Sequence, residues 1–233
     1  PTANRSTDPV ARGDRCARRR ARFRAAPLAV ARRRRAARGD RGAFDAYELR
    51  SLSERCIYYG YNGPPLQPPS YNDIHQIFQT PDHVVIFNEM VHSARIVPLD
   101  GRPHISSSIR QWPGDSRGRW EDDTLVVETT NFTDKAGQRA AIGRLFVTFS
   151  GSAHARLVER FTRISPHAIQ YGFTVEDPDT WTRPWTAEVQ LTKNDEPLYE
   201  YACHEGNYAM EGILAGARAE EKAAAQAANQ GSR

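Results

Sequence analysis

The sequence lacks any apolar stretch close to 18 residues, and its mean hydropathy is −0.67. No segment is therefore apolar enough over a sufficient length to be read as a transmembrane helix. The motifs G-x-x-x-x-G-K-[ST], G-x-G-x-x-G, H-E-x-x-H and C-x-x-C are also missing. Their absence removes common signatures of nucleotide binding, zinc proteases and dithiol chemistry. With 233 residues, 39% of them hydrophobic, the chain is still long enough to bury the core of one medium-sized domain.

Cysteine is scarce, with three residues in the chain. Cys16 lies in an Arg-rich N-terminal region, which leaves Cys56 before the first expected strand and Cys203 in the last one. In an oxidising compartment these two can form a disulfide, and closing so long a loop adds up to ~5 kcal/mol of stability in the chain-entropy model. Two buried thiols are an equally acceptable alternative. A catalytic pair of Cys203 with His204 is disfavoured, because neighbours in a strand point to opposite faces.

Acidic side chains are rare at the N-terminus, where residues 1–42 contain 14 Arg, no Lys and 3 Asp. The rest of the chain carries 18 basic and 25 acidic side chains, so the body is mildly acidic although the whole chain has a net charge of +4. Residues 1–43 have too few apolar side chains to offset the cost of ordering and are predicted to be a disordered arm. No signal peptide is visible, because Arg32–Arg35 follow the short apolar stretch Ala25–Ala31.

From residue 44 onward the composition becomes ordinary and β-type patterns dominate. Residues 44–70 are predicted to be a Pro-rich connector, residues 71–208 an antiparallel β domain, and residues 209–228 an Ala-rich C-terminal helix. In Ala168–Glu176 and again in Trp185–Thr192, apolar and polar side chains alternate. Ser165-Pro166-His167 marks a hairpin before the first of these segments.

The expected strands follow one another at short spacing, without helices between them. The other expected strands are His83–Val97, with a bend near Ser93, Thr124–Thr130, Arg156–Ile164 and Leu198–His204. Such a pattern is typical of a mainly β fold, in which an antiparallel meander curls into a barrel or packs as a two-layer sheet.

Several long motifs occur in a fixed order: QTPDHVVIFNEMVHSARIVPLDGRPH, QWPGDSRGRWEDDTLVVETTNFTDK, FTVEDPDTWTRPWTAEV and YEYACHEGNYAMEGILAGARAEEK. Over roughly residues 50–222 the chain thereby resembles an uncharacterised family of exported bacterial proteins. The resemblance implies a β-rich fold and an extracytoplasmic setting, and it implies no reaction. Residues 1–43 and 136–155 depart from the family's pattern.

A candidate site is predicted from side chains inside these motifs. His92, His104 and His204, together with Glu89 and Glu205, are the candidate catalytic groups, because an imidazole beside a carboxylate can titrate near neutral pH. Arg95 would hold an anion, and Tyr208 would lie at the rim. In a continuous strand Glu89 and His92 have opposite parity, so both can line one concavity only across a bend. The spacings match no metal motif, and no cofactor is indicated.

Three functions follow as hypotheses. The first is a small exported β-barrel that binds a small organic molecule, with lyase or hydrolase activity at an open end as an extension. The second is a non-catalytic envelope or interaction module. The third is nucleic-acid binding through the Arg-rich arm, which the acidic body and the lack of interleaved aromatic residues disfavour.

Overall fold

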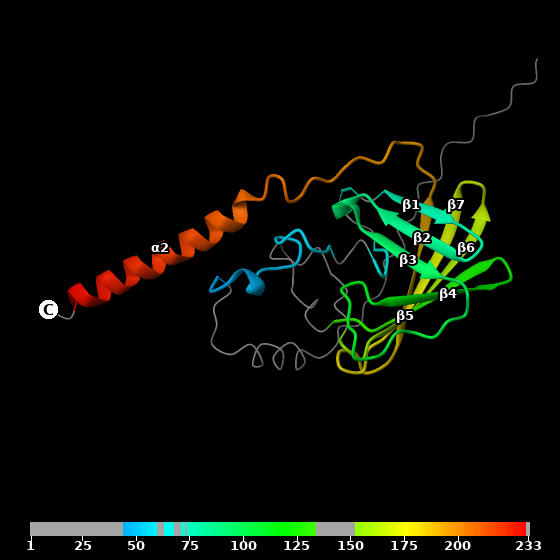
Figure 1. Cartoon of the computed structure of the whole chain (residues 1–233), viewed down its shortest axis with the longest axis horizontal. Helices are drawn as coiled ribbons and strands as arrows, with labels where there is room; N and C mark the ends of the chain where they lie inside the picture. Colours follow the sequence, from blue (N-terminus) through cyan, green and yellow to red (C-terminus); the bar gives the residue numbers. More distant parts are fainter. Residues whose placement is uncertain (1–43, 60–62, 68–70, 73, 134–151, 232–233) are drawn as a thin grey trace, which may run out of the picture.

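The computed structural model describes residues 44–59, 63–67, 71–72, 74–133 and 152–231 (Figure 1). The predicted arm at 1–43 lies outside these residues. The strands are β1 (His75–Gln79), β2 (His83–Asn88), β3 (Ala94–Pro98), β4 (Asp115–Glu121), β5 (Thr124–Thr130), β6 (Arg156–Ser165), β7 (Ala168–Glu176) and β8 (Trp185–Thr192). Two short 3₁₀ helices, η1 (Tyr47–Leu49) and η2 (Met90–His92), and the long helix α2 (Tyr208–Gly231) complete the set. No helix among the described residues has the length and apolarity needed to cross a membrane.

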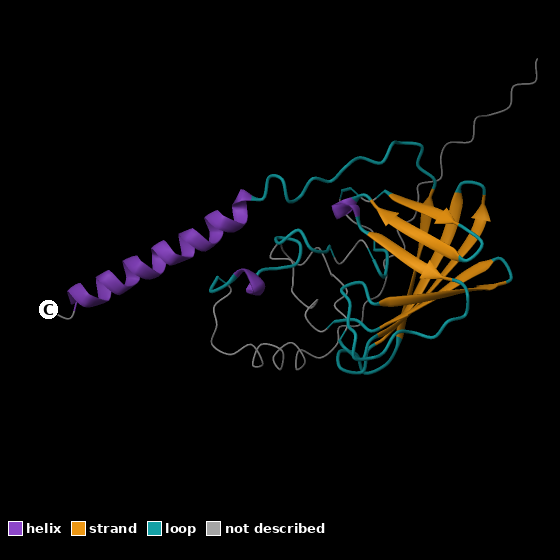
Figure 2. Cartoon of the chain, viewed as in Figure 1, coloured by secondary structure: helices purple, strands orange, loops and turns teal. Residues whose placement is uncertain are grey.

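The strands form two antiparallel sheets in chain order, β1-β2-β3 and β4-β5-β6-β7-β8, which confirms the mainly β meander. The sheets are not closed into a barrel, so the two-layer form of the prediction applies (Figure 2). β3 and β4 meet closely, because a Cβ atom on Gly118 would lie 2.7 Å from methyl groups of both Val97 and Leu99. The outermost strands β1 and β8 have no strand partner on their free sides among the described residues.

The core lies between the sheets, where alternate residues of each strand point inward. In β7, Tyr171, Phe173 and Val175 are buried, as the alternation predicted, and the Ser165-Pro166-His167 hairpin is confirmed. Their register neighbours in β6 are Phe161, Glu159 and Leu157, all buried. This face packs against Val84, Ile86 and Val97 of the smaller sheet.

Residues 63–67 take a larger part in the fold than a connector would. Leu66 is buried in the main core, and its backbone N–H donates a hydrogen bond to the Tyr171 hydroxyl at 2.9 Å. The Tyr58 hydroxyl donates to the carbonyl of Gly63. Leu66, in this part of the predicted connector, therefore belongs to the core between the two sheets.

Two predicted strands differ from the structure. Residues 83–97 form a hairpin rather than one bent strand, because β2 ends at Asn88 and β3 begins at Ala94. Residues 198–204 belong to no strand, although a last strand was predicted there. They lie instead along the N-terminal segment, where Tyr201 stacks edge-on with Tyr59 and Cys203 is bonded to Cys56.

The outer surfaces also carry apolar side chains. On the outer face of β1-β2-β3, Phe78, Val85 and Ile96 lie side by side in register, and Ile96 is 60% exposed. Helix α2 projects away from the sheets (Figure 1), and its Arg218 donates to the backbone carbonyls of Phe44 and Asp45.

Candidate functional site

Glu89 and His92 lie in the tight connection between β2 and β3. Val91 and His92 have φ angles of 50° and 42°, a strained conformation for side-chain-bearing residues and above all for β-branched valine. The strand-parity argument therefore does not apply to this connection. Glu89 is 3% exposed and accepts a hydrogen bond from Asn72 Nδ2 at 2.6 Å. Its Oε2 has no hydrogen-bond partner among the described residues, and His92 is exposed.

Arg95 points into the core between the sheets, where it meets Glu159 of β6. Its guanidinium donates to both carboxylate oxygens, at 2.5 and 3.1 Å. The Tyr171 hydroxyl donates to Glu159 Oε1 at 2.7 Å and accepts from the Leu66 N–H at 2.9 Å. Burial, together with the nearby Glu159 charge, raises the pKa of Tyr171 well above its ordinary value. Arg95 is therefore engaged by a carboxylate of its own chain, which makes it a link between the sheets.

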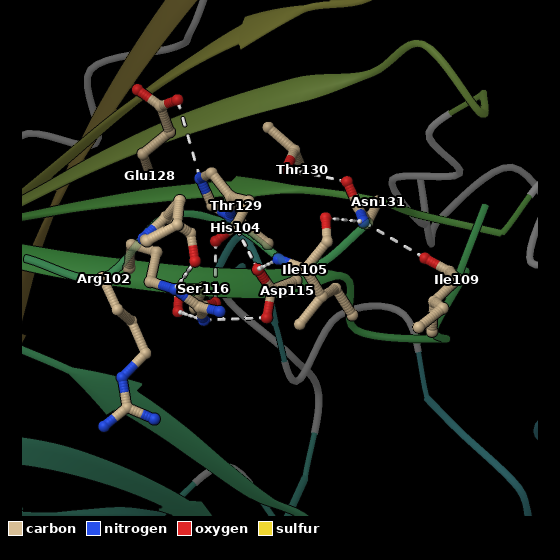
Figure 3. A network of polar contacts seen from close by, with 12 residues as sticks. Arg102, His104, Ile105, Ile109, Asp115, Ser116, Glu128, Thr129, Thr130 and Asn131 are labelled. Atoms are coloured by element: carbon tan, nitrogen blue, oxygen red, sulfur yellow. Dashed lines mark hydrogen bonds and ion pairs between the residues drawn. The ribbon is translucent and has the colours of Figure 1, made fainter. Parts of the chain in front are cut away.

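His104 lies on the loop between β3 and β4, against the start of the larger sheet (Figure 3). Its Nδ1 is 2.7 Å from Asp115 Oδ2, and its Nε2 is 3.7 Å from Glu128 Oε1. The same Asp115 carboxylate accepts from the backbone N–H of Ile105 and from Arg117. The imidazole is thus held between two carboxylates of neighbouring strands.

Asn131 completes the anchoring of this loop. Its side-chain N–H groups donate to the carbonyls of Ile105, Ser106 and Ile109, at 2.9–3.2 Å (Figure 3). The His104 network therefore fastens the loop that connects the two sheets. That role accounts for all of its polar contacts without a ligand.

The Glu128 carboxylate of this network gives a pH-dependent prediction. A hydrogen bond from Arg156 at 2.5 Å lowers the pKa of Glu128 from its usual 4.5, against the opposing effect of burial. A lowered folded-state pKa contributes stability above pH 4.5 that is lost as the pH falls through the folded value. We expect Glu128→Gln to cost about 0.2–1 kcal/mol at pH 7 and much less at pH 3. Urea unfolding at both pH values measures this difference.

The matched control for that experiment is Glu188→Gln on β8. Glu188 is exposed and has no ion pair in the part of the chain that the structure describes, so its replacement is expected to change little at either pH. A cost for Glu128→Gln that is equal at pH 7 and pH 3 would contradict the ion-pair explanation.

The C-terminal candidates lie near the disulfide. Cys56 and Cys203 form a disulfide with a Cα–Cα distance of 5.7 Å, so the pairing alternative is confirmed and the two-thiol alternative is wrong. His204 and Glu205 follow it on the surface and are exposed, and Tyr208, at the start of α2, is 79% exposed. Asn207 Nδ2 donates to the Glu54 carbonyl, at 2.9 Å, which holds this segment to the N-terminal part.

The structure therefore divides the predicted site among four places: the β2–β3 connection, the core, the β3–β4 loop and the disulfide region. Among the described residues, no group of three or more His, Cys, Asp or Glu side chains is arranged to hold a metal ion. His92 and His204 are exposed, whereas His104 is paired with Asp115, so the three histidines do not form one site.

A cavity of about 700 Å³ lies elsewhere, between the two sheets on the side of β1 and β8. None of the seven predicted catalytic and ligand-binding residues lines it. Its apolar lining consists of Leu66, Ile74, Ile77, Val84, Ile86, Trp120, Leu125, Phe161, Pro166, Ala168, Ile169, Val189 and Leu191. Its polar lining includes Gln67, His75, Gln79, Asp123, Arg163, Ser165, His167, Gln190, Thr192, Lys193 and Asn194.

The deep part of the cavity is lined by buried apolar side chains, and its rim by exposed polar ones. Leu66, Val84 and Ile86 are buried, whereas Arg163 and Lys193 are exposed. Alternation along β6 offered a signal for this arrangement, because it places Arg163 on the same face as the buried Phe161. Which strands would face each other across the gap was not visible in the sequence.

Comparison of the chain with protein-family models, with curated proteins and with solved structures gives no match. The site is therefore interpreted from its own geometry.

Proposed function

We propose that this protein binds a small organic molecule in the cavity between its two sheets. The observation that carries the proposal is a cavity of about 700 Å³ with an apolar floor and polar groups at its rim. Ligand pockets commonly have volumes of about 300–1,000 Å³ and this mixture of side chains. β1 and β8 are not paired with each other, so the two sheets are not joined on the side where the cavity lies.

The disulfide supports the further proposal of an extracytoplasmic setting, because disulfides persist mainly in oxidising compartments. Lyase or hydrolase activity stays a prediction, and no contact unites the three histidines that would support it. Nucleic-acid binding through residues 1–43 also stays a prediction, since the arm lies outside the described residues.

The proposal is tested with a neutral apolar fluorophore, N-phenyl-1-naphthylamine, on the full chain. Saturable fluorescence enhancement is expected, together with quenching of Trp120, which lines the cavity. At a ligand concentration of 100 Kd, binding should add about 2.7 kcal/mol and raise the midpoint of thermal unfolding by roughly 5–10 °C.

A variant that fills the cavity provides the specific test. Val189 points into the cavity from β8, so Val189→Trp should abolish saturable binding. Thr186→Trp, on the outer face of the same strand, is the matched control and should bind as the wild type does. Binding that survives in Val189→Trp would refute the proposal, and so would a wild type that binds neither this probe nor an anionic probe with the same aromatic body.

A further inference from the structure

We propose that the ligand of this cavity is an organic anion, with an apolar body and a carboxylate or comparable head group, and that Arg163 recognises its charge. The inference rests on the function proposed above and specifies the class of ligand. Its basis is the position of Arg163 within the cavity and the state of its guanidinium.

The register of the larger sheet places Arg163 on the cavity face of β6, at the exposed end of the strand. Leu157, Glu159 and Phe161, its alternate neighbours in β6, are all buried. Arg163 continues this face at the open end of the strand, opposite Ile169 of β7, and Ile169 is in turn opposite Leu191 of β8. All three side chains line the cavity. The strand position of Arg163 therefore adjoins apolar residues of the cavity wall, and its guanidinium lies against the adjoining hairpin, where the charged head group of an amphipathic ligand could reach it.

Arg163 also differs from the other arginines of β6 in having no carboxylate partner among the described residues. Arg156 is paired with Glu128 and Glu176, and Arg160 with Glu121. Within the described ranges, Arg163 donates only to the backbone carbonyls of the adjoining hairpin, both at 3.3 Å. A guanidinium has five N–H donors, and these two long bonds leave donors available for an anion.

The other charged side chains of the lining leave Arg163 as the group that would bind an anion. The lining contains two cations, Arg163 and Lys193, and one carboxylate, Asp123. The charge of Lys193 is compensated by Asp195, which lies outside the lining, and the imidazole of His167 adds an N–H donor. Leu125, Phe161 and Val189 line the same cavity and offer no polar side chain. The part of the ligand that contacts them must therefore be apolar.

Two fluorophores with the same aromatic body test the inference. 1-Anilinonaphthalene-8-sulfonate carries a negative charge, and N-phenyl-1-naphthylamine does not. We expect the wild type to bind the anionic probe about tenfold more tightly than the neutral one. Decanoate should displace the anionic probe, and 1-decanol at the same concentration should do so less effectively. Loss of anionic-probe binding in Val189→Trp assigns the signal to the cavity rather than to the exposed outer face.

Arg163→Gln should remove the preference for the anionic probe and leave the affinity for the neutral probe within about twofold. Arg160→Gln, which removes a paired arginine of the same strand, should keep the preference. Thermal unfolding of both variants confirms that they are folded. An equal affinity of the wild type for the two probes, or a preference that survives in Arg163→Gln, would overturn this inference and leave the cavity as a binding site. Failure of both probes to bind would instead refute the proposed function.

Discussion

Replacing Arg95 with Met is expected to lower the free energy of unfolding by about 3–5 kcal/mol. Arg95 is 7% exposed, and its partner Glu159 is fully buried between the sheets. The substitution keeps an apolar side chain of similar length but leaves the Glu159 carboxylate without a counter-charge in a medium that solvates it poorly. Urea unfolding followed by circular dichroism measures the loss.

Two further variants decide whether charge is the cause. The double variant Arg95→Met with Glu159→Met removes both charges and should recover most of the stability, since a buried ion pair replaced by apolar groups is often neutral. Arg102→Met breaks an exposed pair with Asp100 and should cost less than about 1 kcal/mol. An Arg95→Met variant that costs no more than Arg102→Met would contradict the core role of Arg95.

The same double variant separates the two roles considered for Arg95. If Arg95 links the sheets and does not contact the ligand, the double variant should still bind the anionic naphthalene probe with an unchanged affinity. Loss of that affinity in a stably folded double variant would show that Arg95 takes part in ligand binding, as the sequence predicted.

Removal of the disulfide is the second change with a large expected effect. Cys56 and Cys203 are 147 residues apart, and opening a loop of this length costs up to about 5 kcal/mol in the chain-entropy model. Cys56→Ser with Cys203→Ser should therefore strongly lower the midpoint of urea unfolding. Reducing the wild-type protein should have the same effect, because it opens the same loop.

Cys16 supplies the control for this prediction. Cys16→Ser leaves the disulfide intact and should not change the unfolding midpoint. In the denatured wild type, one thiol should react before reduction and three afterwards, since the chain has three cysteines. Three reactive thiols before reduction would show that the bond is not formed in the protein.

Local sequence determined much of the fold. Tyr171, Phe173 and Val175 alternate with polar neighbours, and a strand with this pattern can bury only one face, so the inner face of β7 followed without knowledge of its partners. The hairpin after Ser165 and the helix of residues 208–231 depend on short-range chemistry in the same way. Connections with unusual backbone geometry were less accessible. The chain reverses between Asn88 and Ala94 through Val91 and His92, both at positive φ. Neither is a glycine, the residue type that would have predicted this turn from the sequence.

The candidate site depended on contacts that no local pattern contains. The sequence predicted Arg95 and His104 as site residues. In the structure Arg95 is paired with Glu159, and His104 with Asp115. The partner of Arg95 is 64 residues away, and only the packing of one sheet on the other brings them together. The cavity has the same origin. Alternation along β6 is enough to put Arg163 on the same face as Phe161. The cavity itself exists because β3 and β4 lie close together on one side of the sandwich while β1 and β8 leave the other side open, and that spacing is set by how the two sheets pack.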